Sequence, residues 1–462
     1  PRKWSVFTLR PSRRRALEGT GAIKGRGTCF GCGFCAGLCP TGAISMEIDC
    51  RTGTYVPVVD EPKCVGCGIC RAVCPSASLD LTALNLSVFG HLPKDPYVGN
   101  FRKIYVGYAT DPELRYSASS GGLATALVMK ALEDGLADAA LLVKMDEQRP
   151  LLPEPFLARS SEEVRQAIGS KYCPVPLGTA LREALGTDEK LAVVGLPCHM
   201  WALREAERAV EALRGRVAIR IGLFCFHTAN FYGLLLVLHK LGVRPSEVAH
   251  LAFRGRGWPG EMVVRLKDGG ERTLSFHDLF VLWGTWLFSP LPCLLCPDAL
   301  NELADISLGD AWHLPEFTGT RSPGHSLVIV RTPAGEELLA SAERDGIVRL
   351  REVGLRELYR SQGAGLRFKK RGLAARRRLL RELAREIHVK APSPQAPSVR
   401  DWLSSALATF TARVSSRPWA LAFFSHVPRF LFGLYSSAFF TLLGKAKPNW
   451  CEALAHELGQ QP

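Results

Sequence analysis

Short apolar runs alternate with longer amphipathic stretches through the middle of the chain. The apolar runs have the length of β-strands and lie at residues 104–108, 139–143, 191–195, 217–223 and 326–331. Residues 121–134 have helical spacing. This alternation predicts a mixed α/β domain, with helices layered on a sheet, over residues 103–355. Residues 262–276, interrupted by Asp268-Gly269-Gly270, predict a β-hairpin inserted into that domain.

The pattern changes on both sides of this domain. Residues 1–28 are basic and without periodicity, which indicates an N-terminal arm. Residues 29–84 form a cysteine-rich unit with a strand-turn-strand signal in its middle. Residues 84–102 contain two prolines and predict a loop-rich connector. A basic, helical C-terminal extension is expected over 356–462. The fold class is therefore α+β or mixed α/β.

The cysteines of the N-terminal unit form two runs, Cys29 to Pro40 and Cys64 to Pro75, each with the spacing C-x2-C-x2-C-x3-C-P. This spacing is typical of two-cluster ferredoxins, in which the fourth cysteine of each run binds the other 4Fe–4S cluster. The predicted ligand sets are Cys29, Cys32, Cys35 and Cys74 for one cluster, and Cys64, Cys67, Cys70 and Cys39 for the other. Structural zinc usually shows two separate C-x2-C pairs, and a disulfide framework belongs to exported chains.

Composition and charge narrow the class of protein. The chain has 462 residues, 15 cysteines and a formal net charge of +14. This length allows two or three domains. Arg13-Arg14-Arg15 superficially resembles a twin-arginine export signal, but no apolar segment follows it. We therefore expect a cytoplasmic protein whose cysteines serve metal binding and not disulfides.

Seven cysteines lie outside the two runs. Cys293 and Cys296 form a C-x2-C pair in a predicted loop, while Cys198 and Cys225 follow two neighbouring strands, where sites assemble in α/β folds. These four thiols could hold a third cubane cluster, and His199 or Asp298 could replace one of them. Free cysteines are, however, also common as small buried hydrophobes. The three others, which we expect to be incidental, are Cys50, Cys173 and Cys451.

Two glycine-rich stretches are candidate binding sites. Ser119-Ser120-Gly121-Gly122 opens the predicted helix, so it could bind an anion or a flavin edge, or could simply cap the helix. Gly255 to Gly260 has G-x-G-x-x-G spacing but precedes a hairpin and contains a proline, so it is no dinucleotide fingerprint. Arg254, Arg256 and Trp258 suit stacking on a planar ring and pairing with phosphate or carboxylate. A solvated basic loop is the alternative.

The C-terminal extension carries a dense cationic run at helical spacing. Its members are Arg367, Lys369, Lys370, Arg371, Arg376, Arg377, Arg378, Arg381 and Arg385. Such a run is usually a solvated helix face, but it could also meet an acidic partner or anionic lipid. Nucleic acid is not expected, because aromatic residues do not interleave the cations. The apolar segment 430–443 is shorter than the ~20 residues that span a bilayer. It could pack on the core, lie in a membrane interface or dock on a partner subunit.

Seven segments together resemble the beta subunits of the coenzyme F420 hydrogenases and dehydrogenases, a family of flavin and iron–sulfur proteins. They are residues 119–127, 169–172, 195–204, 221–225, 253–260, 293–298 and 304–312, in the family's order. Many members also carry an N-terminal two-cluster ferredoxin. Two features depart from the family. Cys173 replaces the usual aliphatic residue after Gly169 to Tyr172, and the chain beyond 356 is longer than a minimal member needs.

The resemblance implies an FAD, a third 4Fe–4S cluster on Cys198, Cys225, Cys293 and Cys296, and coenzyme F420 as cosubstrate. By the same resemblance, the stretch from Arg254 to Trp258 faces the flavin or the incoming coenzyme. The residues expected to bind the flavin or the coenzyme are Ser119, Ser120, Gly121, Gly122, Thr125, Lys171, Pro197, Arg254, Gly257 and Trp258. The implied architecture is a two-cluster ferredoxin domain, a larger flavin-binding α/β domain over 103–355 and a helical extension.

The leading functional hypothesis is an oxidoreductase that exchanges a hydride with coenzyme F420 at FAD. Single electrons would then pass through the clusters to or from a partner oxidoreductase or a membrane complex. The C-terminal tail could bring the protein to the inner membrane surface. One alternative is a ferredoxin-dependent reductase of another organic substrate, of the chlorophyll-pigment type. The other is an electron-transfer adaptor without a substrate of its own.

Overall fold

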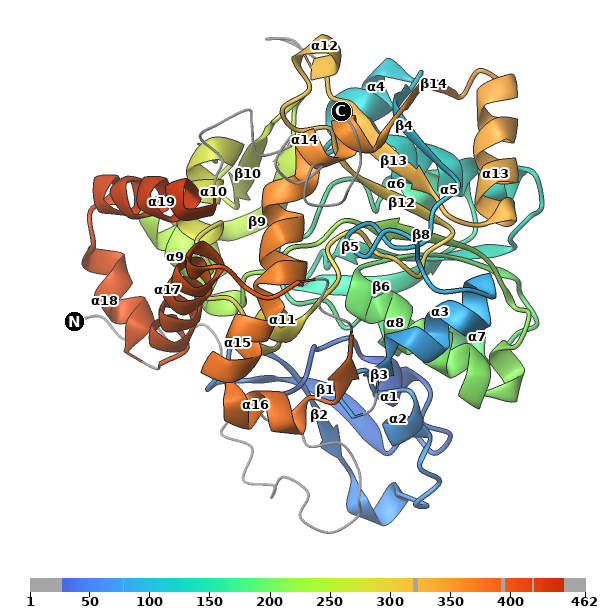
Figure 1. Ribbon diagram of the computed structural model, residues 1–462, viewed down its shortest axis with the longest axis horizontal. Helices are drawn as coiled ribbons and strands as arrows, with labels where there is room; N and C mark the ends of the chain where they lie inside the picture. The colour runs from blue at the N-terminus through green and yellow to red at the C-terminus, as the bar shows by residue number, and fades with distance from the viewer. Residues whose placement is uncertain (1–26, 78, 319–322, 392–394, 418, 444–462) are drawn as a thin grey trace.

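The computed structural model describes residues 27–77, 79–318, 323–391, 395–417 and 419–443, so nearly all of the basic arm and Cys451 lie outside the described residues. Its centre is an eight-stranded sheet in the order β14-β4-β13-β12-β8-β7-β5-β6 (Figure 1). The strands are β4 Lys103–Ala109, β5 Ala139–Met145, β6 Pro153–Ala158, β7 Leu191–Gly195, β8 Val217–Leu223, β12 Ile306–Asp310, β13 Ser326–Val330 and β14 Val348–Val353. All five predicted strands are present, and the mixed α/β class is confirmed.

The sheet has a parallel centre with antiparallel edges. β5, β7, β8 and β12 pair in parallel, while β6, β13, β4 and β14 are each added by an antiparallel pairing, so that β4 runs in the same direction as the four central strands. Alternate residues of β5 pack on opposite faces, because side chains along a strand point to alternate sides. Leu142 lies in the core formed with α5 (Leu123–Glu133) and α13 (Pro333–Arg344), whereas Leu141 lies in the core formed with α8 (Pro197–Ala209). Both faces are covered, which explains the continuous apolar runs.

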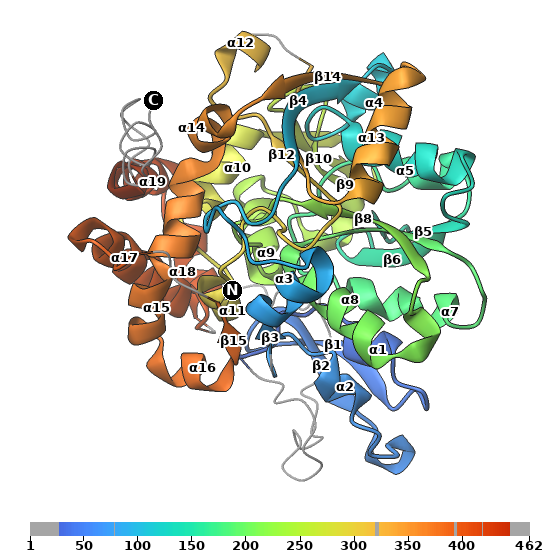
Figure 2. The same cartoon turned by 45° about the vertical axis from the view of Figure 1, so that its right-hand side comes forward.

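The N-terminal unit lies below this sheet in the views of Figures 1 and 2. It contains α1 Phe34–Gly37, β1 Ile44–Asp49, β2 Thr54–Val59, η1 Glu61–Lys63 and α2 Ile69–Ala72. The predicted strand-turn-strand is present as the antiparallel pair β1–β2. The unit is bonded directly to the larger domain. Gly178 N–H donates to the Cys32 carbonyl at 2.9 Å, and the Asn230 amide donates to the Thr52 carbonyl at 2.8 Å.

The predicted hairpin is confirmed but is part of a three-stranded sheet. Its strands are β9 Val248–Gly255, β10 Glu261–Leu266 and β11 Glu271–Ser275, in the order β11-β10-β9. This small sheet packs with α9 Phe231–Lys240 and α10 Phe276–Trp283. Because β9 extends to Gly255, Arg254 lies in a strand and not in the flexible loop that the glycines suggested.

The connector prediction is wrong at its start, where α3 (Leu81–Phe89) forms a helix. The Asp80 carboxylate caps it by accepting the Ala83 N–H at 3.0 Å. Leu81 and Leu84 are buried, and Gly90 ends the helix with φ 76°. The helix is complete before the first proline of the connector. Shorter helices occupy other connections: α4 Pro112–Ser117, α6 Ser161–Arg165, η2 Leu177–Ala180, α7 Leu181–Ala184, η3 Glu211–Leu213, η4 Pro245–Glu247, α11 Leu291–Leu295 and α12 Pro315–Thr318.

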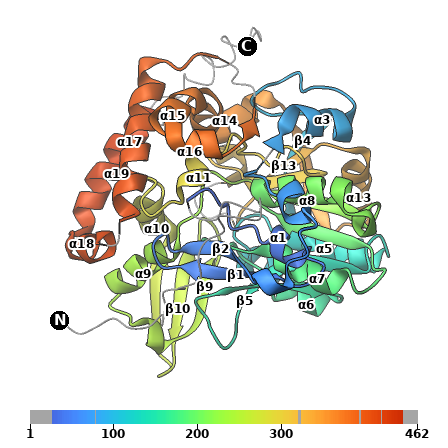
Figure 3. The same ribbon diagram turned by 90° about the horizontal axis from the view of Figure 1, so that it is seen from below.

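The C-terminal extension is helical and packs along one side of the molecule (Figure 3). It comprises α14 Leu355–Leu366, a π-helical turn Arg367–Arg371, α15 Leu373–Leu379, α16 Arg381–Glu386, α17 Val399–Ser415, α18 Ala420–His426 and α19 Arg429–Leu443. β15 (Val389–Lys390) pairs in parallel with β3 (Leu79–Asp80), which follows the second cysteine run. The expectation of a wholly solvated cationic face is wrong, because Lys369, Lys370 and Arg376 are buried. No helix in the described ranges has the length and apolar character needed to cross a bilayer.

Candidate functional site

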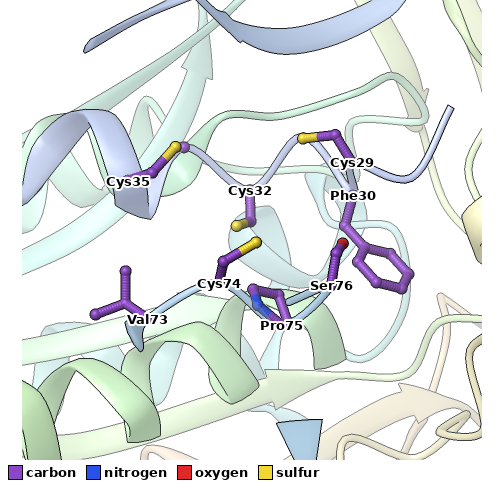
Figure 4. Close-up of a pocket in the computed structure, with 9 residues that line it drawn as sticks. Cys29, Phe30, Cys32, Cys35, Val73, Cys74, Pro75 and Ser76 are labelled. Carbon is purple, nitrogen blue, oxygen red and sulfur yellow. The ribbon is translucent and has the colours of Figure 1, made fainter. Parts of the chain in front are cut away.

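Four thiols from the two cysteine runs line one pocket. They belong to Cys29, Cys32, Cys35 and Cys74, the set predicted for the first cluster (Figure 4). The Cys29 sulfur accepts the Gly31 N–H at 3.2 Å. Within the residues described, no three His, Cys, Asp or Glu side chains are close enough to share a single metal ion. In a cubane cluster each thiolate binds a different iron, so such ligands stand further apart.

The second predicted set lies nearer the surface. Burial, together with the thiols of Cys67, Cys64 and Cys39, raises the pKa of Cys70. These thiols are therefore within electrostatic reach of one another, and Cys67 is exposed. The two sets are neighbours, because Cys39 and Cys70 pack in the same cluster as Cys35 and Cys74.

The third group of thiols gathers beside the ends of β7 and β8. Cys198 lies in the first turn of α8, and Cys225 follows β8. Burial raises the pKa of Cys198 well above its ordinary value, with further contributions from the thiols of Cys32, Cys225, Cys293 and Cys296. The third group therefore adjoins the first through Cys32. Cys293 lies in the short helix α11 and not in the predicted loop, because Pro292 occupies an early helical position where no N–H is needed.

One residue that positions this group was not recognised in the sequence. The Asn301 side-chain amide donates to the carbonyls of Gly195 at 2.8 Å and Leu223 at 3.2 Å, so it joins the ends of β7 and β8. Its backbone is left-handed, with φ 59°, a conformation that asparagine tolerates better than most residues. An asparagine in a turn was the only signal available.

The two possible substitutes for a thiol have backbone partners. The Asp298 carboxylate accepts the N–H groups of Leu300, Asn301 and Glu302 at 2.7–3.0 Å. The His199 ring accepts the Leu196 N–H at Nδ1, and its Nε2 lies 3.1 Å from the Val175 carbonyl. Burial lowers the pKa of His199 to about 4. Both side chains therefore stabilise the turns that carry the cysteines.

A lysine of the extension reaches the third group of thiols. Lys369 is 1% exposed, and its Nζ donates to the Cys293 carbonyl at 3.2 Å. It forms no ion pair with a carboxylate of the described chain. A buried ammonium without a counter-ion is costly, and four thiolates around an iron–sulfur core carry a net negative charge. The surroundings of this group therefore fit an anionic cluster.

Three glycine-containing segments meet near the end of β4 and the start of β13, where Gly121 packs on Gly107 and Ser326. Ser119 Oγ accepts the Ser170 N–H at 2.8 Å, and a Cβ on Gly169 would lie 3.1 Å from the Arg254 carbonyl. Lys171 turns back on its own segment, where its Nζ donates to three carbonyls at 2.6–3.1 Å. Burial lowers the pKa of this ammonium to about 7. The structure thus brings together the predicted stretches around Ser119, Lys171 and Arg254, whereas Pro197 lies beside Cys198 at the start of α8.

The guanidinium of Arg254 binds a carboxylate of its own chain. It forms a bidentate pair with Asp310 at 2.7 and 2.8 Å, and Trp258 Nε1 donates to the same carboxylate at 2.7 Å. Trp258 also packs on Trp312, with ring centroids 4.7 Å apart. Arg256 is at the surface and pairs with Glu271 at 2.8 Å. Arg254 and Trp258 therefore form a rigid wall beside the glycine segments.

The start of α5 has features that fit an anionic group. Gly122, with φ 77°, precedes the helix, and no side chain caps its first N–H groups. Thr125 lies in that first turn. Arg115 packs beside Gly122, with its guanidinium 3.6 Å from the Tyr108 ring centroid, and has no carboxylate partner in the described part of the chain. Free helix-start N–H groups next to an uncompensated arginine suit a phosphate.

Comparison with known proteins places most of the chain in one family. The description "Coenzyme F420 hydrogenase/dehydrogenase, beta subunit" matches residues 104–182 with its N-terminal part and 188–354 with its C-terminal part. A "4Fe-4S dicluster domain" matches residues 28–78. The C-terminal extension lies beyond all three matches.

Two individual relatives bear names of this family. The chain is 31% identical over 273 residues to the coenzyme F420 hydrogenase subunit beta of Methanosarcina barkeri, covering 56% of this chain and 85% of the relative. It is 27% identical to the F420-dependent formate dehydrogenase 1 subunit beta of Methanococcus maripaludis, covering 54% and 61%. A solved structure of the F420-reducing NiFe hydrogenase complex from M. barkeri is 25% identical with a TM-score of 0.49, covering 65% of this chain and 98% of that one.

Proposed function

The chain belongs to the coenzyme F420 hydrogenase/dehydrogenase beta-subunit family, an oxidoreductase family, and it carries a 4Fe–4S dicluster domain. From this premise we propose that it exchanges a hydride with coenzyme F420 at a bound FAD and passes single electrons through three clusters to or from a partner protein. The observation that carries this proposal is the adjacency of the three thiol groups. Phe30, next to Cys29 of the first group, packs in one core with Cys198, Cys293 and Cys296, and Cys35 packs in one cluster with Cys39 and Cys70 of the second group.

The residues that would hold each group follow from the geometry. Ser119, Ser120, Gly121, Gly122 and Thr125 at the start of α5, with Lys171 nearby, would hold the flavin, and Arg254, Gly257 and Trp258 would wall its site. Pro197 would contribute where α8 begins beside Cys198. The twelve cysteines of the three groups would be the cluster ligands. When bound, the flavin would convert between a hydride and two single electrons, which the clusters would carry one at a time.

Aromatic side chains of this chain exclude water from the space between the first and third groups of thiols. Phe30, beside Cys29, packs edge-to-face on Trp201 of α8, with ring centroids 5.9 Å apart. Trp201 is fully buried, and both rings lie in the apolar core that contains Cys296. A low-polarity, water-excluding boundary shields clusters from solvent, and burial is one of the factors that sets their potentials.

The test is anaerobic addition of reduced coenzyme F420 to the purified protein. Loss of flavin absorbance, followed by reduction of the clusters in the EPR spectrum, is the expected result. Bound FAD that stays oxidised, with or without an added oxidoreductase partner, would contradict the hydride exchange and would leave an adaptor role. If the chemically reduced protein were reoxidised by another organic acceptor but not by oxidised coenzyme F420, the reductase alternative would be favoured.

We also propose that the outer face of the C-terminal helices contacts an anionic membrane surface. Phe410 of α17 and Phe430 of α19 are each 66% exposed, and Trp419 and Phe423 are exposed beside α18. In the described part of residues 399–443 the single carboxylate, Asp401, is buried, whereas Arg413 of α17, Arg417 after it and Arg429 of α19 are exposed. Exposed aromatic rings beside arginines, with no outward acid, match an interfacial lipid-binding surface.

Vesicle sedimentation tests this contact. The protein should sediment with phosphatidylglycerol-containing vesicles and less with pure phosphatidylcholine, and added salt should weaken the binding. The double variant Phe410→Ser, Phe430→Ser should bind at least about tenfold more weakly, because two apolar anchors are lost. Leu92→Ser, at an exposed leucine outside the extension, is the matched control. Failure to bind either kind of vesicle would exclude the proposed membrane contact. A protein partner would then be the remaining candidate to cover this face of the C-terminal helices.

A further inference from the structure

The C-terminal extension contributes directly to the third group of thiols, although it lies outside the residues that match the family. We propose that Lys369 is a positioning residue that supplies a fixed positive charge beside the third cluster, and thereby raises its reduction potential. This inference rests on the proposed function, since it assumes that the cluster is present. It gives the extension a role in electron transfer that its basic composition alone would not indicate.

The contacts of Lys369 single it out among the cations of its run. Its Nζ donates to the Cys293 carbonyl at 3.2 Å and lies 5.7 Å from the Trp286 ring centroid. The preceding residue, Phe368, packs in the same core as Cys198, Cys293 and Cys296. The ammonium is therefore held beside this group of thiols.

The neighbouring cations have other partners. Lys370 pairs with Glu302 at 2.5 Å, and Arg367 and Arg371 pair with Asp401 at 2.8 and 2.9 Å. Among the described residues no such carboxylate meets Lys369, so its charge is directed at the thiols. A cluster is the anion that would compensate it.

Arg376 holds Lys369 in place. Its fully buried guanidinium donates to the carbonyls of Leu294 at 2.5 Å, Phe368 at 2.6 Å and Lys369 at 3.2 Å. One side chain therefore ties the backbone of the π-helical turn to the backbone of the Cys293–Cys296 segment. π-Helical turns are often found at functional sites. This clamp fixes the distance between the ammonium and the thiols.

The direction of the effect follows from electrostatics. A 4Fe–4S core with four thiolates carries a net charge of about 2−, and uptake of one electron makes it about 3−. A buried positive charge stabilises the more negative, reduced form, and it does so strongly because the interior screens poorly. Removing Lys369 should therefore make the cluster harder to reduce.

The experiment is an EPR-monitored redox titration of the holoprotein. Lys369→Gln should lower the ratio of reduced to oxidised third cluster at least tenfold at a fixed potential, which corresponds to a shift of ~59 mV for one electron. Lys369→Arg should keep most of the wild-type ratio, because the charge remains. Arg381→Gln, which removes one exposed cation from the same extension, is the control and should leave the ratio unchanged.

Iron analysis separates the possible failures. A Lys369→Gln protein with about twelve irons per chain and an unshifted potential would overturn this inference but leave the third cluster intact. A wild-type protein with only about eight irons would remove the third cluster, and this inference with it. Loss of about four irons in Lys369→Gln but not in Lys369→Arg would support the counter-charge. Loss of these irons in both variants would show that the shape of the lysine side chain matters and not its charge. That result would contradict the proposed counter-charge.

Discussion

At the scale of single residues, His325 lies where a second positive charge is unfavourable. Its ring is 3.3 Å from the Arg115 guanidinium and packs edge-to-face on Tyr108, with ring centroids 5.1 Å apart. Burial, and then Arg115, lower the pKa of His325 to about 4. The folded protein therefore keeps this ring neutral over a pH range in which an unfolded chain would protonate it.

This shift predicts a pH dependence of stability. Between about pH 6.5, the ordinary histidine value, and about pH 4, the unfolded chain binds the proton first, so the free energy of unfolding should fall as the pH falls. Above about pH 6.5 His325 should contribute no slope. Urea unfolding at pH 7.5 and 5.0 should show that the free energy of unfolding falls less between these two pH values in His325→Gln than in the wild type. The exposed His426→Gln is the control, and equal losses in all three proteins would contradict the prediction.

At the scale of elements, the N-terminal unit packs on the larger domain through backbone contact between glycines. A Cβ on Gly37 of α1 would lie 1.8 Å from the Gly178 carbonyl, and a Cβ on Gly178 of η2 would lie 2.5 Å from Phe34. Side chains are thus excluded from this interface. The contact sets the position of the first thiol group relative to the α/β domain.

Gly178→Ala should therefore loosen the two units. We expect a loss of about 1–3 kcal/mol in the free energy of unfolding, because the methyl group overpacks a close backbone contact. Gly433→Ala is a matched control in α19, where a Cβ would meet nothing within 4 Å. It should be stabilising by about 0.5–1 kcal/mol, because alanine favours a helix interior. Urea unfolding checks both values, and a Gly178→Ala protein as stable as the wild type would show that the interface can adapt.

The sequence revealed elements whose physical cause is local. Strands β4, β5, β7, β8 and β13 were visible because burial on both faces leaves unbroken apolar runs, and the two cysteine runs carried their own spacing. Helix α3 was not predicted, because Pro93 and Pro96 indicated a loop over the whole connector, although both prolines lie after the end of the helix. The burial of Lys369 and Arg376 was missed for a different reason. A cationic run looks the same whether its charges face water or a buried anion, and only the tertiary structure shows which.

At the scale of the whole molecule, three thiol groups form a row. The second group reaches the surface at the exposed Cys67, the first lies between, with Cys32 and Cys35 buried, and the third lies beside the strand ends of the large sheet. In this arrangement single electrons would enter or leave at Cys67, which is where a partner protein would have to dock.

The third group is the link on which this account depends, and iron analysis of anaerobically purified protein tests it most directly. We predict about twelve irons per chain in the wild type and about eight in Cys225→Ala, with the ferredoxin EPR signals retained. Cys50→Ala, outside all three groups, should keep about twelve. About eight irons in the wild type, or an unchanged count in Cys225→Ala, would contradict the account.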